Sequence, residues 1–161
     1  MSFFQGKQKR SVAETAITVS AHTKLSVSKR VDVDTQIVEY EEDTDSGMIA
    51  IVSRANTEDY SHRNKKGLVM VFPRDIKSGT YPAKDPQFEN IYYFETATIP
   101  GYTKSIQYNA VNGSVIIDVV ENTAKSLIYK ITLDIKVVDD KTNEELNIVG
   151  KKDFRAFFEP L

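Results

Sequence analysis

The strict alternation of apolar and polar side chains from Ser126 to Val138 is the feature that most constrains how this chain can fold. Lys130, Thr132 and Asp134 fall on one face of an extended segment. The apolar residues fall on the other face: Leu127, Tyr129, Ile131, Leu133, Ile135 and Val137. Because successive side chains of a strand point to opposite faces, whereas a helix would scatter these two sets around its circumference, the segment is predicted to be a long β-strand.

Similar alternation recurs along most of the chain, and turn residues separate the runs. Further strands are predicted at Gln36 to Glu41, Met48 to Arg54, Leu68 to Phe72, Phe88 to Ala97 and Leu146 to Phe158, and in one long bent strand or two consecutive strands between Ile17 and Val33. The segment SVAETAITVSA is the best helix candidate, but its β-branched residues favour a strand. We therefore expect an all-β fold, a single antiparallel β-sandwich or flattened barrel of about nine or ten strands.

The dipeptide Asn112-Gly113 stands between two alternating runs, Lys104 to Ala110 and Ser114 to Glu121. Asn-Gly is the dipeptide best suited to a two-residue hairpin turn, because both positions need a positive φ. The sequence therefore predicts a tight hairpin in which Tyr108 lies opposite Ile117.

Length and composition fit one ordinary domain. The chain has 161 residues, of which 40% are hydrophobic, and it contains no cysteine, which excludes disulfides, thiolate zinc sites and cysteine nucleophiles. We expect a flexible tail over residues 1–10 and a single β domain over residues 11–161, with a mobile loop between Ala55 and Gly67.

Charge and hydropathy bear on partners and location. The net charge of −2 gives no reason to expect nucleic-acid binding, which usually needs a basic face. No apolar run is long enough to span a membrane. The first residues are apolar and then polar and basic, the reverse of a signal peptide, so the default expectation is a cytoplasmic protein.

The acidic stretch YEEDTDSG, from Tyr40 to Gly47, could hold calcium or form a turn. An EF-hand loop that began at Asp43 would need glycine at its sixth position and glutamate at its twelfth, where this chain has Met48 and Arg54. Asp, Ser and Gly are typical turn residues. The stretch is therefore predicted to be a turn, and no metal site is expected.

No set of residues has the pattern of a catalytic site. The only histidines, His22 and His62, fall on a polar strand face and in a polar loop, and no glycine-rich phosphate loop is present. We therefore predict no catalytic residue and no cofactor. A glycosidase-like carboxylate pair stays open, because 23 acidic residues allow many pairs in space.

Aromatic and aliphatic residues outside the expected core supply the candidate binding residues. In FENIYYFETATIPGY, alternation assigns Phe88, Tyr92 and Phe94 to the core, and Ile91 and Tyr93 to the other face beside acidic residues. That face is either an exposed patch or a covered position between sheets. Four residues are the candidates for binding: Ile91, Tyr93, Ile116 and Val120.

The segment VFPRDIKSGTYPAKDP, followed by YNAVNGSVIIDVVE, a long strand and a terminal KKDF, resembles a pattern met in small, largely uncharacterised bacterial β-sandwich proteins. The resemblance extends from about Gly67 to Phe158. It implies a single-domain β-sandwich, and many such proteins are exported or lipid-anchored. It implies no catalytic residue.

Three classes of function follow from these observations. The first is a non-catalytic binding or interaction module with a protein partner or a second copy of the chain. The alternative is a small-ligand- or carbohydrate-binding β-barrel or sandwich, with a cavity lined by Tyr92, Phe94, Tyr108 and Tyr129. The third is a hydrolase with a carboxylate pair.

Overall fold

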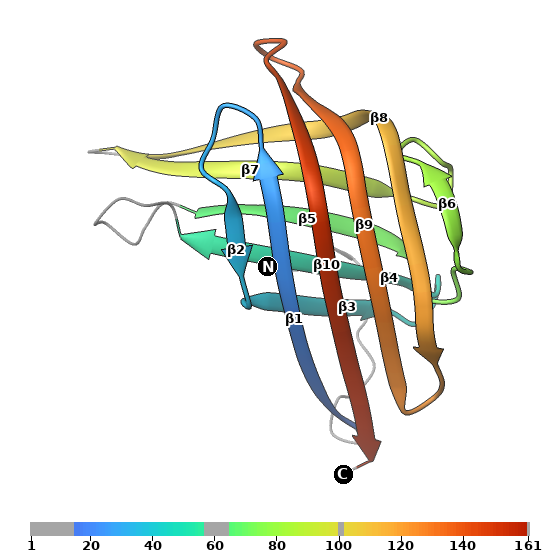
Figure 1. Ribbon diagram of the computed structural model, residues 1–161. Helices are drawn as coiled ribbons and strands as arrows, with labels where there is room; N and C mark the ends of the chain where they lie inside the picture. Colours follow the sequence, from blue (N-terminus) through green and yellow to red (C-terminus); the bar gives the residue numbers. More distant parts are fainter. Residues whose placement is uncertain (1–14, 57–64, 100–101, 161) are drawn as a thin grey trace.

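The computed structural model describes residues 15–56, 65–99 and 102–160, and they form one antiparallel sheet of ten strands (Figure 1). The strands are β1 (Thr15–Val27), β2 (Val33–Thr35), β3 (Val38–Asp43), β4 (Met48–Asn56), β5 (Lys65–Pro73), β6 (Gly79–Pro82), β7 (Asn90–Ile99), β8 (Tyr102–Asn122), β9 (Ser126–Asp139) and β10 (Glu145–Pro160). Their order in the sheet is β2-β1-β10-β9-β8-β7-β5-β4-β3, and β6 pairs with β8. The predicted all-β fold and strand number are confirmed.

The sheet folds over on itself, so that its two halves face each other across the core. Strands β1, β10 and β9 run in front, and β7, β5, β4 and β3 cross behind them (Figure 1). The two ends of the sheet approach each other without closing into a barrel. We call this open line, where β1 and β2 pass β3 and β4, the seam. Across it, the Thr35 hydroxyl donates a 2.7 Å hydrogen bond to the Arg54 carbonyl oxygen.

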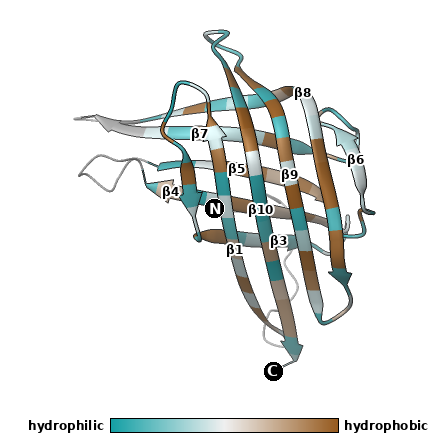
Figure 2. Ribbon diagram, in the orientation of Figure 1, coloured by the Kyte–Doolittle hydropathy of each residue, from teal (hydrophilic) through white to brown (hydrophobic). Residues whose placement is uncertain are grey.

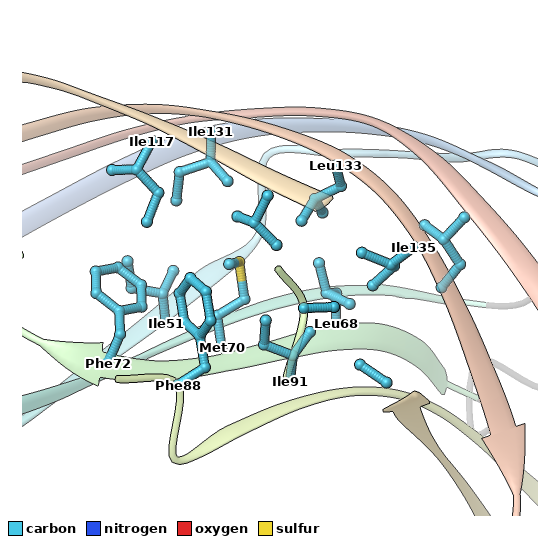
Figure 3. Packing of buried hydrophobic residues seen from close by; sticks show 14 of the residues in the cluster. Ile51, Leu68, Met70, Phe72, Phe88, Ile91, Ile117, Ile131, Leu133 and Ile135 are labelled. Carbon is cyan, nitrogen blue, oxygen red and sulfur yellow. The ribbon is translucent and has the colours of Figure 1, made fainter. Parts of the chain in front are cut away.

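Alternation along β9 and β10 builds the front layer of the core. Hydrophobic and hydrophilic residues alternate along both strands (Figure 2). In Figure 3, Ile117, Ile131, Leu133 and Ile135 of the front layer face Ile51, Leu68 and Met70 of the back layer, and all are buried. The long strand predicted at Ser126 to Val138 is thus confirmed as β9.

The predicted hairpin at Asn112-Gly113 is wrong, because β8 runs through this dipeptide without turning back. The strand pairs with β7 up to Asn109, and with β6 from Ser114 to Ile117. Along β9, Ala110 pairs with Val137 and Asn112 with Lys136, which leaves Val111 as the extra residue of a β-bulge. Figure 1 shows β8 bending from the back layer to the front layer. Asn112-Gly113 therefore follows the bulge at a corner of the sheet.

The prediction of which β8 residues face the core nevertheless holds. Tyr108, Ala110, Val115 and Ile117 are all buried, as the hairpin would have required. A bulge inserts one residue and so reverses which face the later residues occupy. A two-residue turn and a single bulge therefore leave the same apolar pattern in the sequence.

The strands predicted between Ile17 and Val33 and the turn predicted in the acidic stretch are both present in the structure. The alternation between Ile17 and Val33 belongs to two strands, β1 and β2, which pair with each other at Thr23–Leu25. The acidic stretch ends β3 and turns into β4. Asp43 accepts hydrogen bonds from the Asp45 amide and the Ser46 hydroxyl, and Gly47 follows with φ 74°.

The turn between β9 and β10 repeats this arrangement. Asp139 accepts hydrogen bonds from the Lys141 amide and the Thr142 hydroxyl, and Asn143 has φ 62°. These two bonds lower the pKa of Asp139 below its usual value, and the bond from the Lys141 amide has the larger effect. Both acidic turns are therefore explained by local backbone bonding.

The structure corrects the predicted strand list and the predicted face of Tyr92 and Phe94. The short strand β6 was not predicted, and Tyr92 and Phe94 do not lie in the main core. They are partly buried on the outer face of the back layer, where they pack on a second cluster of Ala50, Val52, Val69 and Val71. Phe88 precedes β7 and does join the main core. The tail at residues 1–10, most of the predicted loop and His62 lie outside the described residues.

Candidate functional site

The structure separates the four candidate binding residues. Ile91 and Tyr93 are buried in the main core, on the inner face of β7. Ile116 and Val120 on β8 are exposed, with 45% and 52% of their surface accessible. The four residues therefore do not form one surface.

Ile116 and Val120 are exposed for different reasons. Ile116 is on the outer face of the front layer, where its neighbours across the strands are Thr80 and Thr132. Val119 pairs with Tyr129 and Glu121 with Ile128, so Val120 is the extra residue of a second bulge. Ile116 and Val120 are therefore isolated exposed side chains and do not belong to one broad apolar patch.

The aromatic residues proposed to line a cavity also separate. Tyr108 and Tyr129 are buried in the main core, whereas Tyr92 and Phe94 pack on the outer cluster. The hydroxyl of Tyr129 donates to the Arg74 carbonyl oxygen at 2.7 Å. These four rings therefore do not face one common space.

A cluster of charged and phenolic groups closes one end of the core. Arg30, in the β1–β2 turn, bonds to Glu95 of β7 at 2.8 Å and to Glu144 of the β9–β10 turn at 3.2 Å. Tyr93 donates to Glu95 at 2.8 Å, and Tyr108 donates to Glu144. We call these five residues the Arg30 cluster.

The Arg30 cluster brings two carboxylates together, but their environment favours a structural role. A hydrogen bond from Tyr108 lowers the pKa of Glu144, while burial raises the pKa of Tyr108 to about 12. The hydrogen bond to Glu95 raises the pKa of Arg30, and this effect is larger than the lowering that burial causes. A general acid in glycoside hydrolysis needs a raised carboxyl pKa, and Glu144 shows the opposite shift. The cluster links the β1–β2 and β9–β10 turns to strands β7 and β8, and this link is its structural role.

Replacing Arg30 with methionine is expected to destabilise the protein by about 2–3 kcal/mol, because two half-buried carboxylates would lose their shared cation. Denaturant unfolding at neutral pH measures this change. The matched control is Lys136→Met, which breaks the more exposed Lys136–Glu145 pair and is expected to cost less than about 1 kcal/mol. Equal losses of stability from the two substitutions would contradict a stabilising role for the Arg30 cluster.

Lys152 on β10 is the most unusual polar residue of the described chain. Its side chain is fully buried on the inner face, and its Nζ forms no hydrogen bond with any described residue. Its neighbours across the strands are Ile131 of β9 and Thr23 of β1. Burial lowers the pKa of Lys152 to about 7. A buried lysine of this kind is typical of sites that use an unprotonated amine.

Two buried hydroxyls meet at the seam, and one of them belongs to Thr23, the cross-strand neighbour of Lys152. The Thr23 and Ser53 hydroxyl oxygens are 2.7 Å apart, and this contact joins β1 to β4. Sequence reasoning missed this group of three residues. The signal was a lysine on the face that otherwise carries Ile148, Phe154 and Ala156, a polar residue in a run of core positions.

The remaining sites proposed or excluded by the sequence are simple to place. His22 is exposed on the outer face of β1, where its Nε2 lies 2.7 Å from an Asp34 oxygen. In the part of the chain that the structure describes, no group of three or more His, Asp or Glu side chains could hold a metal ion. Within the same residues, there is no helix of the length and hydropathy needed to cross a membrane.

The free edges of the sheet differ in charge. Strand β3, at one end of the sheet, carries the acidic residues Glu39, Glu41, Glu42 and Asp43. Strand β1 pairs with β10 along its whole length but with β2 only at Thr23–Leu25. Among the described residues, nothing pairs with the other edge of Thr15–His22, and Thr15–Ala21 contains no charged residue, proline or glycine. Within the described chain, this segment is an unpaired and uncharged edge of the sheet.

Comparisons with known proteins add no relative. No protein-family model, no curated protein and no solved structure matches the chain. The resemblance to bacterial β-sandwich proteins therefore stays an expectation.

Proposed function

We propose that this protein is a non-catalytic interaction module that binds by strand pairing at the free edge of β1, and that the partner which fits this edge is a second copy of the chain. The observation that carries the proposal is the uncharged segment Thr15–Ala21, whose outer edge pairs with none of the described strands. An unpaired edge offers a row of backbone donors and acceptors to another strand. Natural proteins usually protect such an edge with charge, proline or a bulge.

Charge distribution favours a second copy as the partner. If two copies paired through β3, its acidic residues would face one another and repel. Two β1 edges carry no such opposition. In an antiparallel pairing centred on Val19, Ile17 would lie opposite Ala21, and Thr18 opposite Ser20 of the second copy. This register keeps apolar side chains on one face and polar ones on the other.

The exposure of Ile17 supports the same edge. Ile17 lies on the face of β1 that is buried further along the strand, yet 44% of its surface is exposed. Val19 and Ala21 on this face are already packed against the core. A paired strand would cover Ile17 with apolar side chains.

Two adjacent proline substitutions, Ile17→Pro and Thr18→Pro, test the proposal. In an antiparallel ladder, successive N–H groups point to opposite neighbours, so one substitution removes a bond to β10 and the other removes a free-edge donor. We expect wild type to sediment as a dimer that dissociates on dilution. The free-edge variant should keep its melting temperature and weaken dimerisation about a hundredfold.

The other variant supplies the control. Because it breaks the β1–β10 ladder, it should lower the melting temperature. Sedimentation of wild type as a monomer at every concentration would overturn the proposal, and so would equal dimerisation of wild type and both variants.

A further inference from the structure

The seam gives Lys152 a distinctive position. Thr23, its neighbour on β1, contacts Ser53 of β4 across the seam. The approach of β1 to β4 at this point rests on a hydroxyl–hydroxyl bond between side chains rather than on a backbone ladder. Lys152 therefore lies one strand away from the seam.

We propose that the amine of Lys152 captures small apolar aldehydes as a reversible imine, with entry through the seam. The polar residues at this place are Lys152, its cross-strand neighbour Thr23, and Ser53, whose hydroxyl contacts that of Thr23. Ile131 lies next to the amine on β9 and faces the core in Figure 3. The apolar surroundings select against charged carbonyl compounds, which would lose their hydration on entry.

The charge state of Lys152 suits this chemistry. Among the described residues, no acid bonds to the amine, and its pKa of about 7 arises from burial. Three other titratable groups at or near the core have partners of their own. Tyr40 bonds to Glu42, Tyr129 to the Arg74 carbonyl oxygen, and Lys66 to the carbonyl oxygens of Val31 and Asp32. At pH 7, a lysine with this pKa has about a thousandfold larger unprotonated fraction than an ordinary lysine.

The reaction is a condensation that releases water. The Nζ lone pair attacks the carbonyl carbon, and one amine proton passes to the carbonyl oxygen, which gives a carbinolamine. The oxygen then leaves as water with the second amine proton, and a C=N bond remains. The imine nitrogen is a hydrogen-bond acceptor, and the Thr23 hydroxyl is a donor on the neighbouring strand. Exclusion of bulk water slows the reverse hydrolysis.

Reductive trapping tests the proposal on the folded protein at pH 7. The protein is incubated with butanal and cyanoborohydride, and alkylation of each lysine is measured by peptide mass spectrometry. Lys151 is the matched internal control, because it is adjacent in sequence but exposed on the outer face. We expect alkylation of Lys152 to exceed that of Lys151 at least tenfold, in line with its larger unprotonated fraction. Pyridoxal phosphate, a bulky charged aldehyde, should show no preference for Lys152.

The variant Lys152→Met should lose only the fast alkylation. The proposal would be overturned if Lys152 stayed unmodified while Lys151 reacted, or if it reacted only after urea unfolded the chain. A fast reaction of Lys152 with pyridoxal phosphate would overturn the assignment to small apolar aldehydes. Dimerisation through β1 is measured separately, so either proposal can fail without the other.

Discussion

Replacing Lys152 with methionine is expected to stabilise the protein by about 4 kcal/mol at pH 7. Burial lowers the pKa of Lys152 from 10.5 to about 7, and each tenfold change in proton affinity corresponds to about 1.4 kcal/mol. Methionine has a similar length, fills the same space and needs no partner in an apolar core. Denaturant unfolding measures the gain, and the exposed substitution Lys151→Met should change stability by less than about 0.5 kcal/mol.

The gain should depend on pH in one direction. The unfolded chain binds the Lys152 proton more tightly than the folded protein does, so protonation favours unfolding. Stability from this group therefore rises with pH between about 7 and 10.5 and is flat below about 7. From pH 7 to pH 9, wild type should gain about 2 kcal/mol relative to Lys152→Met. A stability difference that does not change with pH would show that Lys152 is not a buried, titrating amine.

Gly113→Ala should produce the largest loss of stability, about 3 kcal/mol or more, since strain and overlap act together. Gly113 has φ 109°, which L side chains rarely adopt, and an added Cβ would lie 2.2 Å from the Asp134 carbonyl oxygen. The Cβ would also lie 2.6 Å from the Ile135 Cα. The backbone of β9 would have to move.

Gly47→Ala separates the two causes. Gly47 also has a positive φ, 74°, but an added Cβ would meet nothing within 4 Å. This variant should therefore lose only the conformational cost of about 1 kcal/mol. Comparable unfolding midpoints for the two variants would contradict the close approach of β8 and β9 at the corner.

Sequence alternation predicted most of the strands because each half of the sheet has one face toward the core. It failed at β8, where a bulge and a turn leave the same pattern. It also failed at Tyr92 and Phe94, because β4 and β5 have apolar residues on both faces. The continuous apolar runs at Met48 to Val52 and Leu68 to Phe72 were the signal that these strands are covered on both sides.

The candidate sites were less predictable, because they depend on contacts between distant segments. Arg30 lies in a short polar turn, and nothing local connects it to Glu95 or Glu144. Thr23 and Ser53 meet only because the sheet folds over on itself. Alternation predicted that β1 is a strand. It did not predict that one edge of β1 pairs with no described strand over Thr15–Ala21, because alternation indicates which face is buried and not which strands are neighbours.

The pairing of β1 with β10 has a consequence for the synthesis of the chain. Thr15 pairs with Pro160, so a strand made early must wait for one made late. Contacts so distant in sequence close slowly, and chains that depend on them fold slowly. During that interval the edge of the uncharged segment Thr15–Ala21 that later pairs with β10 is also exposed, and exposed strands of this kind promote aggregation. Slow cooling, chaperones or low chain concentration should therefore raise the yield of folded protein.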